Sequence, residues 1–235
     1  FRNSTSTSSS TSSFFRGVWV GLFLFLGFAL QNIGMHYTTA SRSGFFTGLL
    51  VVMVPPLALL LRTSRMPVAA WIGLPVAVGG IFLMADPGAG GLNLGDWLTI
   101  ACAFAFALQM IALEVAARRV KDVWLLVYAQ MVTVAAGAVI WCVIEGNPLM
   151  LTKSGWLALI YTGVFGSVVA VWLQTRFQPE VPAGNAAIIF TAEPVFAATF
   201  AWLLLGEGWT ARGLAGAALI LAAMAISSLS VVRKA

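Results

Sequence analysis

Glu193 is the charged residue at the midpoint of the long apolar segment 181–205. An ionised acid at the centre of a helix in lipid costs about 3 kcal/mol, so such residues usually face a cavity or a partner. Because the following Pro194 has no N–H, the Phe190 carbonyl loses its usual helical partner. Two interpretations stay open: Glu193 is a proton or substrate-amine site, or it is a hydrogen-bonded group that holds a kinked helix.

Uncharged polar residues inside the apolar segments are weaker candidates for lining a polar pathway. For Gln31 and Gln174 the structural alternative is a helix end near lipid headgroups, and for Gln109 and Tyr161 it is a hydrogen bond between helices. A proline in a helix removes a backbone bond, so Pro55 and Pro194 are expected to kink their helices. The pathway candidates besides Glu193 are Gln31, Gln174, Gln109, Tyr161, Asn185 and Thr47.

The sequence contains no phosphate loop, no Cys or His pair at metal-ligand spacing and no nucleophile–base set. We therefore expect no cofactor, no bound metal and no enzymatic activity. No Lys or Arg interrupts an apolar segment, so nothing would neutralise a phosphate midway, which argues against phosphorylated cargo.

The composition indicates a membrane protein. Of 235 residues, 60% are apolar and 9% are charged, whereas an ordinary soluble domain carries about 25% charged residues. Such a chain cannot cover the surface of a soluble enzyme or a nucleic-acid-binding protein with polar groups. Cys102 and Cys142 lie inside apolar runs, so we expect no disulfide.

The apolar segments predict an all-α, polytopic membrane protein with eight transmembrane helices. A helix needs about 20 apolar residues to cross the hydrocarbon core, and strands of a membrane barrel would alternate apolar and polar residues, which these segments do not. The expected spans are 17–36, 44–61, 66–85, 97–113, 123–144, 154–175, 181–205 and 213–232.

Basic residues predict the orientation. With a cytoplasmic N-terminus, the outer side receives three of them: Arg42, Lys153 and Arg212. The inner side receives ten: Arg2, Arg16, Arg62, Arg65, Arg118, Arg119, Lys121, Arg176, Arg233 and Lys234. This bias predicts a multi-pass inner-membrane protein with both termini in the cytoplasm. The basic residues are then topology signals and contacts to membrane lipid, and no nucleic-acid partner is expected.

An internal repeat relates the two ends of the chain. A shift of 143 residues superposes Gln31 on Gln174, Ala40 on Ala183 and Gly73 on Gly216, and places Leu50 on Glu193. The first three spans thus correspond to the last three, an odd number of helices apart, which gives them opposite directions. Inverted repeats of this kind are typical of secondary transporters.

The same shift leaves spans 97–113 and 123–144 without partners, so we expect two helices before Phe1. The Ser/Thr-rich residues 1–16 are expected to form a disordered tail. Residues 17–86 would then be the last three helices of a first repeat, and 97–232 a complete second repeat of five helices.

Four stretches resemble the EamA-domain family of drug/metabolite transporters. Segment 25–48 (FLGFALQNIGMHYTTASRSGFFTG) is similar to the first half of these proteins. Segments 185–197 (NAAIIFTAEPVFA), 204–207 (LLGE) and 216–220 (GAALI) are similar to the second half. The resemblance implies a bundle of ten helices in two inverted repeats, of which this chain would carry eight, and a role in export.

These observations predict a transporter, and more specifically an exporter, of small organic metabolites, with proton coupling through Glu193. The alternative is a truncated, non-transporting membrane fragment with a structural or interaction role, and upstream apolar spans would distinguish the two. The small-residue pairs Gly73/Ala77 and Ala218/Ala222 allow close helix packing, either within the bundle or at the seam of a homodimer.

Overall fold

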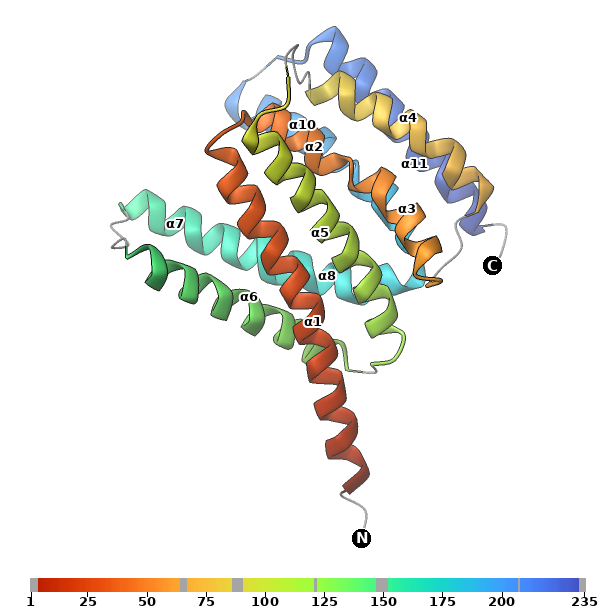
Figure 1. Ribbon diagram of the computed structural model, residues 1–235. Helices are drawn as coiled ribbons and strands as arrows, with labels where there is room; N and C mark the ends of the chain where they lie inside the picture. The colour runs from red at the N-terminus through yellow and green to blue at the C-terminus, as the bar shows by residue number, and fades with distance from the viewer. Residues whose placement is uncertain are drawn as a thin grey trace. The chain divides into compact units, whose positions relative to one another are not determined.

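The computed structural model describes residues 4–63, 67–85, 91–120, 122–146, 152–206 and 208–232, and this part of the chain is helical, without strands. Figure 1 shows the helices in chain order. Their bounds are α1 Ser4–Met35, α2 Ala40–Gly48, α3 Leu50–Leu60, α4 Val68–Ala85, α5 Leu94–Ala117, α6 Val123–Glu145, α7 Lys153–Tyr161, the π-helix η1 Thr162–Val169, α8 Ala170–Phe177, the 3₁₀ turn η2 Gln178–Glu180, α9 Ala183–Phe190, α10 Glu193–Leu205 and α11 Ala211–Val232.

Seven helical stretches in the described residues are long and apolar enough to cross a membrane. They are Thr11–Met35, Arg42–Leu60, Val68–Ala85, Leu94–Ala117, Val123–Glu145, Lys153–Glu180 and Ala183–Leu204. The eighth expected span coincides with α11, an apolar helix of 22 residues. The prediction of an all-helical, multi-span membrane protein is thus confirmed. Of the ten residues expected on the inner side, Arg2, Arg65, Lys121, Arg233 and Lys234 lie outside the described residues, as does Glu207 of the LLGE segment.

Two spans expected to be continuous are each divided into two shorter helices. Leu49 separates α2 from α3, and Thr191 and Ala192 separate α9 from α10. The second break adjoins Pro194, which lies in the first turn of α10, where proline is well tolerated. The first break precedes Pro55 by six residues, and Pro55 itself lies inside α3. The break at Leu49 is thus a separate feature, and the kink expected at Pro55 stays a prediction.

The three elements around these breaks begin at the same spacing in both halves of the chain. Helices α2 and α9 begin at Ala40 and Ala183, α3 and α10 at Leu50 and Glu193, and α4 and α11 at Val68 and Ala211. Each pair is 143 positions apart, which is the shift that relates the two ends of the sequence.

Helix α1 begins earlier than expected. It extends back to Ser4, through most of the Ser/Thr-rich run that was expected to be a disordered tail. Serine and threonine are only moderately unfavourable in helices, so the run continues the helix set by the apolar segment after it.

Helix ends follow local signals. The side chains of Asp122 and Thr152 accept hydrogen bonds from the N–H groups of Leu125 and Gly155, and so cap α6 and α7. Helix α3 ends differently, because Arg62 adopts a left-handed conformation with φ of 54°. The N–H of Arg62 donates to the Leu59 carbonyl and that of Thr63 to the Ala58 carbonyl, the pattern of a Schellman motif.

The chain divides into two compact units, which we describe one at a time. The first comprises residues 1–25 and 112–180, and the second comprises 26–111 and 181–235. In the first unit, a small apolar core forms around Val20, Leu113 and Leu126. Gly17 lies so close to α6 that a Cβ added there would be 2.5 Å from the Cβ of Ala129.

In the second unit, α4 and α11 lie side by side along their length (Figure 1). Glycines permit this approach: a Cβ added at Gly80 would lie 2.8 Å from the Gly216 carbonyl oxygen, and one at Gly73 would lie 3.0 Å from that of Ala223. The Gly73/Ala77 pair thus packs within the chain, whereas Ala218 and Ala222 are exposed. The homodimer seam stays a prediction.

Candidate functional site

Glu193 is the first residue of α10 and its side chain is exposed. It follows the break at which the Thr191 and Ala192 N–H groups donate to the carbonyls of Ile188 and Ile189. No hydrogen bond joins its carboxylate to another residue in the described part of the chain, and both interpretations of Glu193 stay predictions. An acid at a helix N-terminus interacts favourably with the helix dipole, which partly explains how it is tolerated.

The second unit brings two of the candidates into contact. Gln31 of α1 donates from Nε2 to the Thr47 Oγ1 of α2, at 3.3 Å. The buried thiol of Cys102, on α5, hydrogen-bonds with the same hydroxyl. Gln31 and Thr47 are half-buried, so these three side chains form a small polar cluster, partly open to the surroundings, among three helices.

Asn185 lies 2% exposed on α9 and connects that helix to α11. Its Nδ2 donates to the Ser227 Oγ at 2.9 Å and to the Ser227 carbonyl oxygen at 3.1 Å. Its Oδ1 is buried without a hydrogen-bond partner in the described part of the chain. Buried acceptors without a partner are uncommon, so this amide oxygen stands out as an unsatisfied hydrogen-bond acceptor inside the unit.

The remaining candidates are dispersed. Gln109 is buried on α5, in the second unit. Gln174 and Tyr161 belong to the first unit, where Gln174 Nε2 donates to Gln178 Oε1 at 2.9 Å. Tyr161 is 66% exposed at the end of α7. The structure thus groups Gln31 with Thr47.

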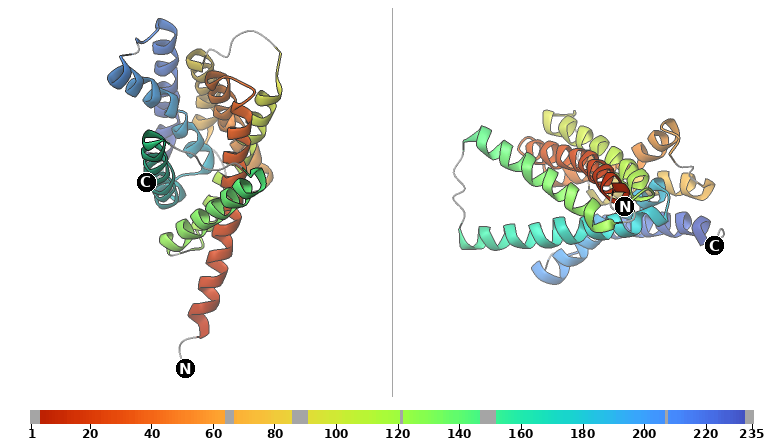
Figure 2. Two further views of the ribbon diagram at one scale, coloured as in Figure 1. Left: turned by 90° about the vertical axis from the view of Figure 1, so that its left-hand side faces the viewer. Right: turned by 90° about the horizontal axis from the view of Figure 1, so that it is seen from below.

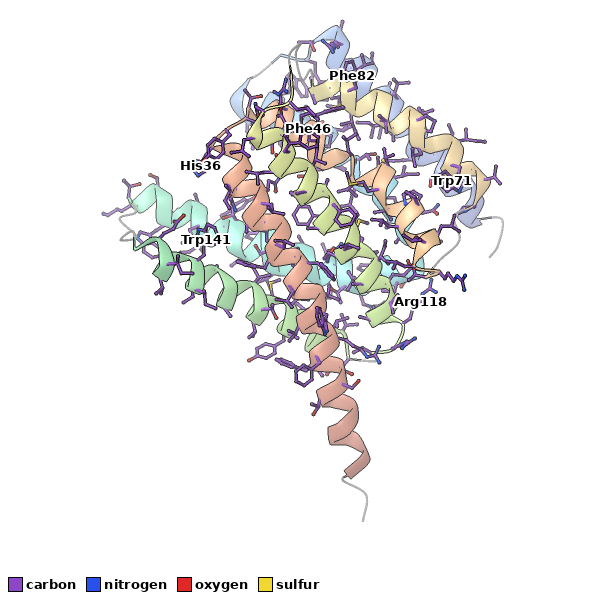
Figure 3. All side chains as sticks on the ribbon, viewed as in Figure 1. His36, Phe46, Trp71, Phe82, Arg118 and Trp141 are labelled. Carbon is purple, nitrogen blue, oxygen red and sulfur yellow. The ribbon has the colours of Figure 1, made fainter. Side chains whose placement is uncertain are left out.

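Sequence reasoning missed an ionic cluster at the start of α5. Asp96 is fully buried and accepts hydrogen bonds from the Arg42 Nε at 3.1 Å and from the Thr38 hydroxyl at 2.7 Å. Arg42 also donates to the Gly91 carbonyl oxygen at 3.2 Å. Its guanidinium lies 5.8 Å from the centre of the Phe46 ring, and Phe46 is labelled in Figure 3. The local signal for it was Asn93-x-x-Asp96, because these two residues cap α5 reciprocally, with N–H to side-chain distances of 2.9 and 3.0 Å.

Close backbone approach positions this cluster. A Cβ added at Gly95 would lie 2.8 Å from the Thr38 nitrogen, so only glycine lets the start of α5 reach the end of α1. Within the described residues no group of three or more His, Cys, Asp or Glu side chains could hold a metal ion.

Comparisons with known proteins agree with the membrane architecture. Residues 93–229 match the model of the EamA-like transporter family. The chain is 31% identical over 215 residues to an uncharacterized transporter of Archaeoglobus fulgidus, which covers 92% of this chain and 69% of that protein. A protein solved by crystallography has the same fold, with a TM-score of 0.75 at 17% identity, over 96% of this chain and 88% of the solved one.

Proposed function

Since the chain belongs to the EamA-like transporter family, and is thus a multi-pass membrane transporter, we propose that it exports small organic metabolites across the inner membrane, coupled to protons. The expected termini are cytoplasmic, as the ten-to-three distribution of basic residues favours.

The paired helix breaks are the observation that carries the proposal. Transporters with inverted repeats bind substrate where corresponding helices of the two halves are interrupted, because interrupted helices expose backbone groups that can bind a ligand. Here the breaks at Leu49 and at Thr191–Ala192 precede helices that begin 143 residues apart. A shared offset over three successive helix starts supports two copies of one structural unit.

The half-helices that precede the breaks are anchored at equivalent positions. Arg42 is the third residue of α2 and binds Asp96 of α5, whereas Asn185 is the third residue of α9 and binds Ser227 of α11. In the proposed topology, these anchors lie at opposite membrane faces. Each then fixes one end of a broken helix while the residues near the break are free to rearrange around a substrate.

The second repeat carries the acid. The residue that corresponds to Glu193 in the first repeat is Leu50. An acid at this position is therefore not required by the architecture that the two repeats share. An exposed carboxylate at the start of a half-helix, with no basic side chain bound to it among the described residues, suits reversible binding of a proton or a substrate ammonium group. A Gln31–Thr47 pair would add neutral hydrogen-bonding groups for a polar substrate.

A two-stage experiment tests this function. Cells that lack their own exporters and express the chain are grown on a panel of toxic amino-acid analogues and lipophilic amines. Survival on at least one compound is expected, and no difference from cells with an empty vector over the panel would contradict export.

For the compound identified, everted vesicles are loaded with a pH-sensitive dye and the compound is added. We expect proton release with the wild-type chain and at least a tenfold slower release with Glu193→Gln, which keeps the side-chain shape but cannot ionise. Glu145→Gln, an exposed acid at the end of α6, is the matched control and is expected to behave as wild type. Release by Glu193→Gln at the wild-type rate would contradict proton coupling through this residue.

A further inference from the structure

A shallow cleft lies in the first unit where the start of α6 meets α8, two helices that lie against each other (Figure 2, right). It has a volume of about 490 Å³ and is lined by Asp122, Val123, Trp124, Trp172 and Arg176. An acid, a base and two indole rings therefore surround one open space, at the N-terminal end of one span and the C-terminal end of another.

The two indoles form the wall of this cleft. The rings of Trp124 and Trp172 stack with centroids 5.7 Å apart and planes inclined by 26°. Trp124 remains 65% exposed, so the stack covers only part of its surface. The face of an indole attracts ammonium groups through its quadrupole.

The two charged groups in the cleft do not neutralise each other. Asp122 uses Oδ1 to cap α6, accepting from the Leu125 N–H at 3.2 Å. Arg176 donates from Nη1 to Glu180 Oε1 at 3.2 Å, an exposed pair of weak energy. No ion pair joins Asp122 to Arg176 in the part of the chain that the structure describes. A ligand with one positive and one negative charge would complement both.

We propose that this cleft binds the headgroup of a zwitterionic phospholipid with a primary ammonium group, phosphatidylethanolamine. The Arg176 guanidinium supplies planar paired donors that match a phosphodiester. Asp122 and the face of Trp124 receive the ammonium group. The cleft lies at the ends of two membrane-spanning stretches, at the depth where tryptophans and lipid headgroups meet, so the lipid is present at high local concentration.

Native mass spectrometry of the purified chain in mild detergent tests the proposal. The protein is titrated with dioleoylphosphatidylethanolamine or with dioleoylphosphatidylglycerol, which shares the phosphodiester but has no ammonium group. We expect wild type to retain one ethanolamine lipid with at least fivefold preference over the glycerol lipid. Equal retention of the two lipids would overturn the proposal.

Variants separate the two halves of the headgroup. Asp122→Asn keeps a residue that caps helices well, and is expected to lower retention of the ethanolamine lipid at least threefold without changing that of the glycerol lipid. Arg176→Gln is expected to lower retention of both lipids about tenfold. Two variants are the controls. Glu145→Gln removes a negative charge, as Asp122→Asn does, at the far end of α6, and Lys153→Gln removes a positive charge, as Arg176→Gln does, at the far end of α7.

Two further outcomes would overturn the assignment. Retention of the ethanolamine lipid by Asp122→Asn and Arg176→Gln at wild-type levels would show that the cleft does not bind it. Displacement of the lipid by an equal concentration of soluble O-phosphoethanolamine would show that the site recognises a free metabolite instead. A melting temperature within about 2 °C of wild type in each variant identifies a loss of retention as a loss of binding and not of folding.

Discussion

Arg42 and Asp96 face each other in a two-pronged ion pair: Nε donates to Oδ1, and Nη2 donates to Oδ2. The carboxylate is fully buried and the Arg42 side chain is 16% exposed. Thr38 and the Asn93 N–H complete the bonding of Asp96. The pair therefore joins the first turn of α2 to the first turn of α5.

Asp96→Asn should destabilise the protein markedly, because it removes the buried negative charge that accepts two hydrogen bonds from the Arg42 guanidinium. We expect the melting temperature to fall by roughly 5 °C or more, measured in detergent by intrinsic fluorescence. Glu180→Gln is the control, since it breaks an exposed pair at the end of α8 and should shift the melting temperature by less than about 2 °C. Equal shifts in the two variants would show that the buried pair is not a strong contact.

Gly80→Ala should separate α4 from α11. The added methyl would lie 2.8 Å from the Gly216 carbonyl oxygen and 3.0 Å from the Ile220 nitrogen, both backbone atoms that cannot move alone. A cost of about 1–3 kcal/mol is expected from such overpacking.

The neighbouring Gly79→Ala is a matched control for this prediction. Its methyl would have no closer neighbour than the Leu219 Cδ1 at 4.0 Å, and alanine is favoured over glycine in a helix by up to about 1 kcal/mol. Denaturant unfolding in mixed micelles should therefore rank Gly79→Ala at or above wild type and Gly80→Ala below it. The opposite order would show that the two helices are not packed in this register.

Thr47→Val should weaken transport without loss of stability. Valine keeps the shape of threonine but lacks the hydroxyl that accepts the hydrogen bond from Gln31 Nε2. If the cluster lines the substrate path, KM for the exported compound should rise severalfold while the melting temperature stays within about 2 °C of wild type. Thr199→Val is the control, because the Thr199 hydroxyl donates to the Val195 carbonyl of its own helix. Unchanged KM in Thr47→Val would remove this cluster from the path.

Single cysteines should report the topology from intact cells. Cys142 is exposed and Cys102 is buried, so the experiment uses a Cys142→Ala background. Cysteines at Tyr37, Leu92 and Thr152 should react with an impermeant maleimide applied outside, and those at Thr63 and Arg119 should react only after lysis. The reverse pattern would contradict the proposed orientation.

The spans could be predicted from the sequence because they depend on apolar length alone, and each expected span coincides with a helix or a divided helix. The break next to Pro194 was also predictable, since it follows from the missing N–H of proline. The break at Leu49 was not, because Leu49 has no residue-type signal and the prolines that follow it lie inside α3.

The polar contacts were harder to predict. That Gln31 reaches Thr47 depends on how α1 and α2 pack, which spacing along the chain does not determine. The Arg42–Asp96 pair joins residues 54 positions apart, and only its local part, the reciprocal cap of Asn93 and Asp96, is visible in the sequence. The π-helix Thr162–Val169, within the span that begins at Lys153, has no counterpart in the equivalent part of α1 and no sequence pattern that we recognise.

The left-handed turn at Arg62 places two demands on a single position. Ending α3 there favours glycine, since a residue with a Cβ costs roughly 1–2 kcal/mol in that conformation. Membrane insertion, however, favours a positive charge beside the span, which glycine cannot provide. In the proposed orientation Arg62 lies at the cytoplasmic end of its span, so Arg62→Gly would relieve the backbone strain of the turn and remove one of the charges expected to direct insertion.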